Sequence, residues 1–438
     1  MSTALTAEAQ RMLRHFIADD PVVEARIREG TLANRTGFAE LTLLDRDGRP
    51  VPRASVRYAQ RSHHYRFGCN LFMLDQFPDP GRNAAYRERF AEFFNLAVVP
   101  LYWSDLEPQD GAPRFAVGSP PVYRRPPVDL CLDYCDAHGI QPKGHPLLWH
   151  QFWPRWLQGS PAEVRRRVAR RFAEISARYA ERIHVWDVCN EAQTFHGTMP
   201  FDAHVDYAFE LAGRHFPGAT LTYNDDRKWW DLQGDYSPVY LLMRHLQTRG
   251  LPVNALGFQY HMFANLLDQT DQFMHPRHLL RVLDQYAKLG VPINLSEISI
   301  ISRRDLGDGD AFQAEVAERL YRLWFSHPAT DGAVWWNLVD GTAAYAPIGS
   351  EEGENSLRAG LLNYDLSEKP AYTALKRLIT QEWTSRGALD YQAGAANAFR
   401  GFHGGYDLEI ETAQGAFRRR VELPPGGARI SLRLEASG

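Results

Sequence analysis

Between about residues 66 and 383, short apolar runs alternate with longer segments whose apolar positions recur every three or four residues. The longer segments, such as 161–183 and 310–326, have the spacing of amphipathic helices, and the short runs have the length of buried strands. The short runs lie at 65–72, 94–102, 140–148, 183–190, 219–225, 255–260, 292–299 and 332–338. Eight alternating strand and helix units predict an α/β fold of the (β/α)8 barrel type.

The same alternation is also found in open, doubly wound parallel sheets. Folds of that kind that bind dinucleotides carry a glycine-rich phosphate loop directly after the first strand. No such loop follows the first run at 65–72. The barrel is therefore the favoured architecture.

The two ends of the chain differ from its middle. Residues 1–30 have a helical pattern, whereas 31–65 contain two strand-like runs joined by an Asp-Gly turn. From about residue 387 onward, short strand-like runs are separated by Gly and Pro. We expect the two β-rich ends to pack together as one small sandwich beside the barrel. The predicted divisions are 1–65 (N-terminal helix and β-rich segment), 66–385 (barrel) and 386–438 (C-terminal β-rich segment).

The composition narrows the classes of partner. Hydrophobic residues make up 44% of the 438 residues, enough for a large core, and the net charge of -4 gives no basic footprint for nucleic acid. No stretch has the roughly 20 apolar residues of a membrane span, and the first residues lack the apolar segment of a signal peptide. We expect a soluble protein with neither nucleic-acid nor membrane partners. It would be cytoplasmic as the sequence stands, and secreted or periplasmic if a leader has been removed.

Polar residues directly after the apolar runs are the candidates for chemistry, because barrel enzymes carry their catalytic residues at the carboxyl ends of strands. Asn190 and Glu191 end the fourth run, and Glu297 lies at the end of the seventh. Neighbouring runs end in His145, Trp149, His150, Trp153, Gln259, His261, Trp335 and Trp336. A single Glu in such a place is most often a solvated residue. Two Glu residues with Asn, His and Trp at neighbouring strand ends favour an active site.

Two carboxylates facing each other across a barrel mouth are what glycoside cleavage requires. In the retaining reaction the two groups lie about 5–5.5 Å apart, and one attacks the anomeric carbon while the other protonates the leaving oxygen. The acid needs a raised pKa, which the charge of the nucleophile helps to supply. We predict Glu191 as the acid/base and Glu297 as the nucleophile.

A metal centre is the competing explanation for the polar cluster. His145, His150 and His261 are conceivable ligands. Of the four cysteines, Cys131 and Cys135 lie four apart in a helical run, which is typical of packing rather than of metal binding. The paired glutamates explain the site without a metal, so we expect neither a metal nor a cofactor.

Seven motifs together resemble glycoside hydrolase family 10, whose familiar members are endo-β-1,4-xylanases. They are GHPLLWH (144–150), HVWDVCNEA (184–192), LTYND (221–225), GFQYH (257–261), INLSE (293–297), WNLVD (336–340) and GLLNYDLSEKPAY (360–372). Each motif is modest alone, but their order along the whole barrel matches that of the family.

The resemblance implies roles for single residues. Glu191 would be the acid/base and Glu297 the nucleophile, and Asn190 would bond the 2-hydroxyl of the sugar in the −1 subsite. His145 and Trp149 would line that subsite. The resemblance further implies sugar-binding or positioning roles for Trp103, Asn224, Gln259, His261 and Trp336. It implies no cofactor and no metal.

Three departures from the family pattern bear on specificity. The family carries Glu, Asn and Lys where this chain has Val98, Val99 and Tyr102, and those residues contact the non-reducing-side sugars. Ser299 replaces an Asp that partners the His matching His261. A second active-site Trp is missing, with Tyr345 as the nearby substitute. We therefore expect a sugar-binding site that differs from that of a standard xylanase.

The sequence as a whole predicts a retaining β-glycoside hydrolase that acts on β-1,4-xylan or related xylo-oligosaccharides. The alternatives are a β-glycosidase with altered glycone specificity and a carbohydrate-binding protein without activity. A metal-dependent hydrolase is a third class. For the retaining hydrolase, the altered glycosidase and the binding protein, the expected partner is an oligo- or polysaccharide. The oligomeric state does not follow from the sequence.

Overall fold

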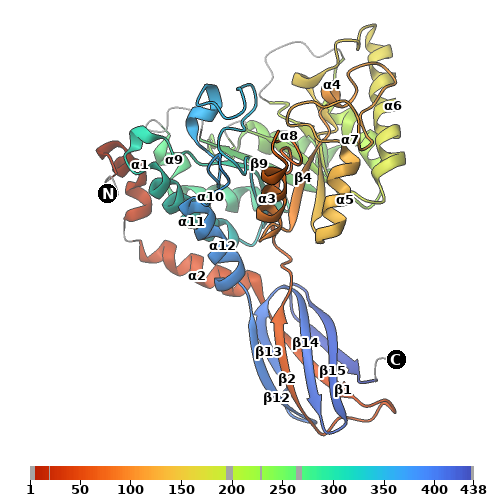
Figure 1. The fold of residues 1–438 in the computed structure, drawn as a ribbon, viewed down its shortest axis with the longest axis vertical. Helices are drawn as coiled ribbons and strands as arrows, with labels where there is room; N and C mark the ends of the chain where they lie inside the picture. Colours follow the sequence, from red (N-terminus) through yellow and green to blue (C-terminus); the bar gives the residue numbers. More distant parts are fainter. Residues whose placement is uncertain (1–4, 19, 194–200, 227–228, 263–268, 436–438) are drawn as a thin grey trace.

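A computed structural model describes residues 5–18, 20–193, 201–226, 229–262 and 269–435. The molecule has two parts, a barrel surrounded by helices and an elongated β-sandwich below it (Figure 1). The sandwich is built from residues 36–60 and 386–433, whereas the barrel strands come from the middle of the chain.

The barrel strands run parallel and close on themselves. In the described residues they are β3 (Arg66–Asn70), β4 (Leu96–Pro100), β5 (Gln141–His145), β6 (Leu148–Trp149), β7 (Val185–Asn190), β8 (Thr220–Asp225), β9 (Ala255–His261), β10 (Ile293–Ser299) and β11 (Thr330–Trp335). The sheet closes because β11 pairs with β3 and β5 pairs with β7. The two short strands β5 and β6 share one position, so the predicted (β/α)8 barrel is confirmed.

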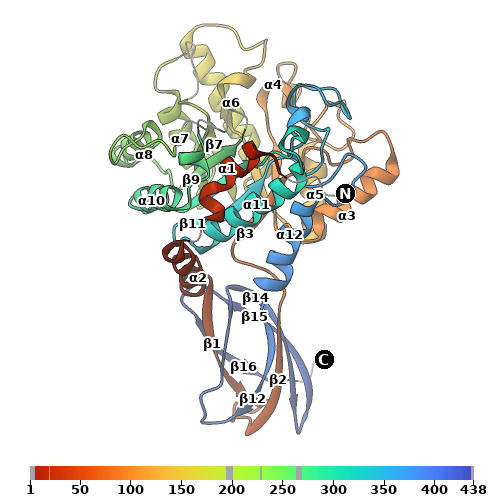
Figure 2. The same ribbon diagram turned by 90° about the vertical axis from the view of Figure 1, so that its left-hand side faces the viewer.

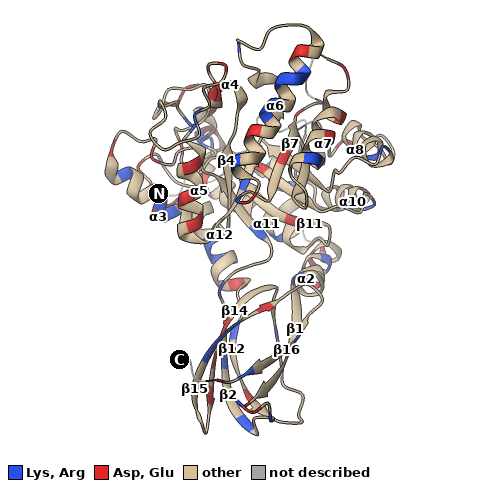
Figure 3. Ribbon diagram, turned by 90° about the vertical axis from the view of Figure 1, so that its right-hand side faces the viewer, with Lys and Arg blue, Asp and Glu red and all other residues tan. Residues whose placement is uncertain are grey.

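Helices connect successive strands on the outside of the barrel. They are α3 (Pro80–Ala91), α5 (Val128–His138), α6 (Pro161–Tyr179), α7 (His204–His215), α8 (Pro238–Thr248), α10 (Pro276–Ala287), α11 (Gly309–Ser326) and α12 (Pro370–Arg377), with short turns of helix at α4 (Trp103–Leu106) and α9 (Thr270–Phe273). Local sequence signals define where helices begin. At α6, for example, Ser160 and Glu163 form a capping box and Pro161 is the first helical residue. Figure 3 shows acidic positions on α5 and basic positions on α6. Charges pair between such neighbouring helices, as where Arg178 of α6 meets Asp129 of α5.

The two chain ends form two packed sheets. Strands β1 (Thr36–Leu44), β13 (Ala398–Phe402) and β16 (Ala428–Arg433) make one sheet, and β2 (Arg53–Gln60), β12 (Arg386–Gln392), β14 (Gly404–Thr412) and β15 (Gly415–Leu423) make the other. Alternate residues point inward, among them Leu43, Val56 and Leu408, and form a core separate from that of the barrel. The predicted β-rich accessory module built from both ends is confirmed.

The first two helices belong with the barrel rather than with the sandwich. Helix α1 (Ala7–Ile17) buries Met12, Leu13 and Phe16 in the barrel core, and α2 (Pro21–Arg35) packs along α11. Within the described part of the chain, no helix is long and apolar enough to cross a bilayer. The predicted divisions at 65/66 and 385/386 fall in the links beside β3 and β12 and stay predictions.

The sandwich lies at the amino ends of the barrel strands. The link from β2 to β3 leads upward into the barrel (Figure 2). Residues at the starts of β3 and β11 line a hollow together with His403 of the sandwich. The carboxyl ends of the strands therefore open on the opposite side. Any site at those ends is remote from the sandwich.

We expect deletion of residues 387–438 to expose β1 and β2 to proteolysis, because β1 then loses both of its partners and β2 loses β12 and β14. A broad-specificity protease, with fragments identified by mass spectrometry, should cut the truncated chain between residues 36 and 60. The intact chain, digested in parallel, should resist there. Equal protection of both chains would show that the N-terminal strands do not depend on the C-terminal ones.

Candidate active site

A cavity of about 400 Å³ opens at the carboxyl ends of the barrel strands. Both predicted carboxylates, Glu191 and Glu297, line it. Apart from Ala344, the remaining lining residues are aromatic or polar: Tyr102, Arg124, Arg125, Trp149, Gln151, Phe152, Asp226, Trp230, Gln259, His261, Gln269, Trp336, Tyr345 and Glu354. A concave site with aromatic walls and converging polar groups is typical of small-molecule or sugar binding.

Glu297 lies at the tip of β10 with 3% of its surface exposed. Its Oε1 accepts hydrogen bonds from Asn224 Nδ2 at 2.8 Å and from Gln259 Nε2 at 3.0 Å. Its Oε2 lies 3.2 Å from His261 Nε2. Contacts at this spacing hold the carboxylate in one orientation.

Glu191 directly follows β7 and adopts a backbone conformation that is unusual for a non-glycine residue, with φ of 54°. Such a conformation costs about 1–3 kcal/mol and is common at functional sites. The Glu191 N–H donates to the Asn224 carbonyl at 2.8 Å, which holds the turn. Its Oε1 accepts from Gln259 Nε2 at 3.0 Å, the same nitrogen that bonds Glu297.

The surroundings of Glu191 disfavour the ionised form of its carboxyl group. Burial raises the pKa of Glu191 well above its usual value, and the negative charge of Glu297 raises it further. The hydrogen bond from Gln259 opposes this shift. Two like charges bridged by one amide nitrogen cannot both be ionised cheaply, so Glu191 is the group that holds a proton.

Asn224 at the end of β8 organises the floor of the site. Besides bonding Glu297, its Nδ2 donates to Asn190 Oδ1 at 2.7 Å, and its Oδ1 accepts from the Ser296 hydroxyl. A Cβ at position 257 would lie 2.1 Å from Asn224 Oδ1, so only glycine leaves room for this amide. Asn190 is buried next to both carboxylates, with its oxygen already bonded by Asn224 and Gln259.

Two histidines flank Glu297 from different strands. His261 is bonded on its other nitrogen, Nδ1, by the Ser299 hydroxyl at 2.9 Å, which leaves Nε2–H to donate to Glu297. Ser299 thus contacts His261 at the position where the family has an Asp.

His145 lies below the cavity, with Nε2 3.9 Å from Glu297 Oε1. Its Nδ1 bonds Asp187 at 2.8 Å, and Asp187 pairs with Lys143 at 2.9 Å. Although burial opposes the shift, Lys143 and His145 hold the pKa of Asp187 below its usual value. His145 is therefore an oriented residue beneath Glu297 rather than part of the cavity wall.

Aromatic rings form one wall of the cavity. Trp336 lies edge-on to His145 and to Phe72, and Trp149 stacks on Phe152 with ring centroids 4.9 Å apart. Flat faces of this kind suit the apolar faces of sugar rings. Tyr345 stands at the rim with 85% of its surface exposed.

The structure places Trp103 away from the cavity. Its ring is buried, its N–H donates to Glu107 at 2.9 Å, and it packs against Trp153 and Trp156. The contact with substrate that the resemblance implied for Trp103 is therefore not visible, whereas its neighbour Tyr102 does line the cavity. Val98 and Val99 are buried in the strand below.

Several cavity residues were not anticipated from the sequence. Arg124 and Arg125 come from the long connection between α4 and α5. Glu354 comes from the connection between β11 and α12. Trp230 and Asp226 follow β8, a strand end at which only Asn224 had been singled out. A strand-end rule could have found Asp226, but nothing in the pattern marks the two arginines.

In the described residues, no group of three or more His, Cys, Asp or Glu side chains has the geometry of a metal site. His150 does not line the cavity that contains His261. All four cysteines are described, and each is buried and unpaired.

Comparison with known proteins adds independent information. The model of glycosyl hydrolase family 10 matches residues 85–378. Endo-1,4-beta-xylanase 2 of Arabidopsis thaliana is 24% identical over 370 residues, which cover 81% of this chain and 31% of that protein. Anti-sigma-I factor RsgI6 of Acetivibrio thermocellus is 23% identical over 407 residues, which cover 89% of this chain and 47% of that protein. The chain thus spans about a third to a half of the length of these relatives.

Among solved structures, xylanase 10B from Thermotoga petrophila RKU-1 in complex with xylobiose superimposes with a TM-score of 0.57. The match covers 73% of this chain and 95% of the xylanase at 19% identity. At this identity the likeness concerns the barrel fold.

We expect replacement of Glu297 by Gln to lower the pKa of Glu191, because the substitution removes a nearby negative charge that favours the protonated form. The titration can be followed by NMR of selectively labelled Glu carboxyl carbons. Glu181→Gln, an exposed position outside the cavity, is the matched control and should leave the titration unchanged. A pKa of Glu191 that stays the same or rises in the Glu297 variant would show that the two groups are not coupled.

Proposed function

Because this chain belongs to glycosyl hydrolase family 10, we propose that it is a retaining β-glycoside hydrolase that cleaves β-1,4-xylan or related xylo-oligosaccharides by double displacement. The observation that carries the mechanism is the Gln259 amide nitrogen, which lies 3.0 Å from an oxygen of each carboxylate. The two oxygens are therefore separated by at most twice that distance. This spacing fits the about 5–5.5 Å of retaining enzymes better than the about 6.5–9.5 Å of inverting ones.

In the first step, Glu297 attacks the anomeric carbon while Glu191 gives its proton to the departing oxygen. The two environments support this assignment: Asn224, Gln259 and His261 lie at hydrogen-bond distance from the Glu297 carboxylate, whereas burial raises the pKa of Glu191. The bond to the leaving group breaks as the ester to Glu297 forms.

In the second step, the Glu191 carboxylate takes a proton from water, and the water oxygen displaces Glu297 from the anomeric carbon. Glu191 is then protonated again and Glu297 is again an anion. Each carboxyl group thus returns to its starting state, with net retention at the anomeric carbon. No cofactor is needed for this balance.

The xylan part of the proposal rests on the relatives. Endo-1,4-beta-xylanases are among the proteins of similar sequence, and a xylanase bound to xylobiose is among those of similar fold. Within the cavity, Trp336 and Trp149 provide faces for pyranose rings. Asn190, which is buried directly beside Glu191, is the proposed partner of the sugar 2-hydroxyl.

A carbohydrate-binding role without turnover is the second candidate. One relative over most of this chain is called an anti-sigma-I factor, a name that does not describe hydrolysis. The replacement of three family sugar contacts by Val98, Val99 and Tyr102 also fits weakened catalysis or an altered glycone. The pairing of Glu191 with Glu297 favours the enzyme over the binding protein.

We expect the wild-type chain to hydrolyse at least one of a panel of aryl β-glycosides and oligosaccharides of the xylose, glucose, arabinose and galactose types. Glu297→Ala should abolish this turnover while leaving binding of the oligosaccharide, measured by calorimetry, largely intact. Glu181→Ala, exposed and outside the cavity, should retain full activity.

Each pattern of hydrolysis has a distinct meaning. Preferred cleavage of xylo-oligosaccharides supports xylan as substrate, and cleavage of another sugar alone supports altered glycone specificity. Binding without any hydrolysis, unchanged in Glu297→Ala, would contradict the enzyme and favour the binding protein.

A further inference from the structure

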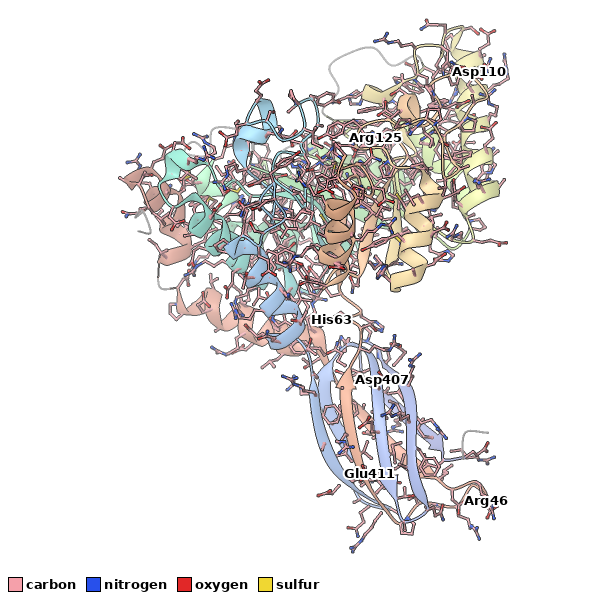
Figure 4. The ribbon with its side chains drawn as sticks, in the orientation of Figure 1. Arg46, His63, Asp110, Arg125, Asp407 and Glu411 are labelled. Carbon is pink, nitrogen blue, oxygen red and sulfur yellow. The ribbon has the colours of Figure 1, made fainter. Side chains whose placement is uncertain are left out.

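Two arginines line the same cavity as the paired glutamates, and the proposed reaction does not use them. Arg124 and Arg125 come from the connection between α4 and α5, and Figure 4 shows Arg125 at the end of the barrel remote from the sandwich. Their side chains lie against Tyr102 and Phe72, with the Arg125 guanidinium 3.7 Å from the Tyr102 ring centroid. Stacking of this kind fixes a planar guanidinium in place.

Arg124 is a buried cation that has only neutral partners close to it. Only 3% of its surface is exposed, and its Nη1 donates to Asn337 Oδ1 at 2.9 Å and to the Thr342 carbonyl. Its Nε is buried and has no acceptor, and no carboxylate of the described residues lies within the 4.0 Å of an ion pair. Glu354 acts on it from farther away. A desolvated charge in this situation is costly unless an anion completes the site.

The protein engages only some of the hydrogen-bond donors of the Arg125 guanidinium. Its Nε donates to Asp105 at 2.8 Å and its Nη1 to the Arg124 carbonyl at 3.1 Å. These bonds orient the guanidinium and leave Nη2 without a bond to any described residue. Two neighbouring guanidinium groups with spare donors match the geometry of a carboxylate.

The position of the arginines identifies which part of a substrate they would contact. Arg124 bonds Asn337 at the end of β11, and β11 lies four strands from β7 in either direction around the barrel. Because Glu191 follows β7 and protonates the leaving group, the opposite wall faces the sugar that becomes attached to Glu297. The arginines therefore lie on the glycone side of the scissile bond.

We propose that Arg124 and Arg125 form a carboxylate-binding subsite, so that the preferred substrate carries a uronic acid on the glycone side. This inference rests on the proposed glycosidase function. The carboxylate can belong to the glycone ring itself or to a uronosyl branch on a xylose residue. Both sources present the same planar anion to the guanidinium pair.

Three aryl β-glycosides test the first source, because the xyloside, glucoside and glucuronide of 4-nitrophenol differ only in the group on C5. We expect wild-type kcat/KM to be at least about 10-fold higher for the glucuronide than for the glucoside. Arg124→Gln should lower kcat/KM for the glucuronide by about 10- to 100-fold more than for the glucoside, as expected for loss of a charge-assisted hydrogen bond.

Xylo-oligosaccharides with and without a glucuronosyl branch test the second source. A preference for the branched compound alone, removed by Arg124→Gln, assigns the carboxylate to the branch. Equal kcat/KM for charged and neutral members of both series, or an equal effect of Arg124→Gln on them, overturns the subsite.

Folding is controlled in the same experiment. Arg125→Gln is the second variant, since it keeps the Arg124 bonds to Asn337 and Thr342, and thermal unfolding reports whether each variant is intact. Arg166→Gln, an exposed position on α6, changes the net charge equally and should leave the glucuronide-to-glucoside ratio at the wild-type value.

If no glycoside is hydrolysed, the proposed function fails, and the subsite is then decided by calorimetric titration with D-glucuronate against D-glucose. Binding of glucuronate that is lost in Arg124→Gln keeps the subsite. Absence of glucuronate binding overturns it.

Discussion

The site depends on the electrostatic coupling of two carboxylates that share one amide donor. Gln259 Nε2 donates to both Glu191 and Glu297, and the side chains of Gln259 and Glu297 are buried at the floor of the cavity. Two anions at this separation repel, so the surroundings must decide which group keeps the proton. Asn224 and His261 add polar contacts to Glu297, whereas burial and the neighbouring negative charge raise the pKa of Glu191. In the proposed mechanism, the division into a nucleophile and an acid therefore comes from the placement of two residues of the same type.

The barrel makes this coupling possible, because it fixes four strand ends at one rim. Glu191 directly follows β7, and Asn224, Gln259 and Glu297 lie within the last three residues of β8, β9 and β10. These four strands are consecutive neighbours in the sheet. Small residues complete the arrangement, as where Gly257 leaves space for the Asn224 amide. The sandwich lies at the other end of the strands and touches none of these groups (Figure 1). We infer that it supports the barrel rather than the chemistry.

Much of this arrangement could be predicted from the sequence, for a physical reason. Strands buried on both faces give continuous apolar runs, and a polar residue directly after such a run, like Glu191 or Asn224, stands out. Loops have no regular pattern of apolar positions from which the placement of their side chains could be predicted. Arg124 and Arg125 lie in an irregular connection, and their approach to the cavity depends on bonds to Asn337 and Asp105, which are distant in the sequence or in another element.

Trp103 was singled out from a sequence motif, but the direction of its side chain could not be predicted. A motif preserves the residue, but its direction is set by a buried acceptor on Glu107 and by two tryptophans beyond it. The pattern also could not reveal that the first helix packs on the barrel, because its apolar face fits either part. Side-chain direction and the choice of packing partner are tertiary properties, and they carry the specificity of the site.

The central claim, that Glu297 forms a covalent bond with the sugar, is tested most directly by trapping the intermediate. The dinitrophenyl 2-deoxy-2-fluoro glycoside of the sugar that is turned over fastest should inactivate the protein and add the mass of one fluorosugar. Peptide mapping should locate that mass on Glu297. Release of product without any labelled protein, or a label on Glu191, would contradict the account.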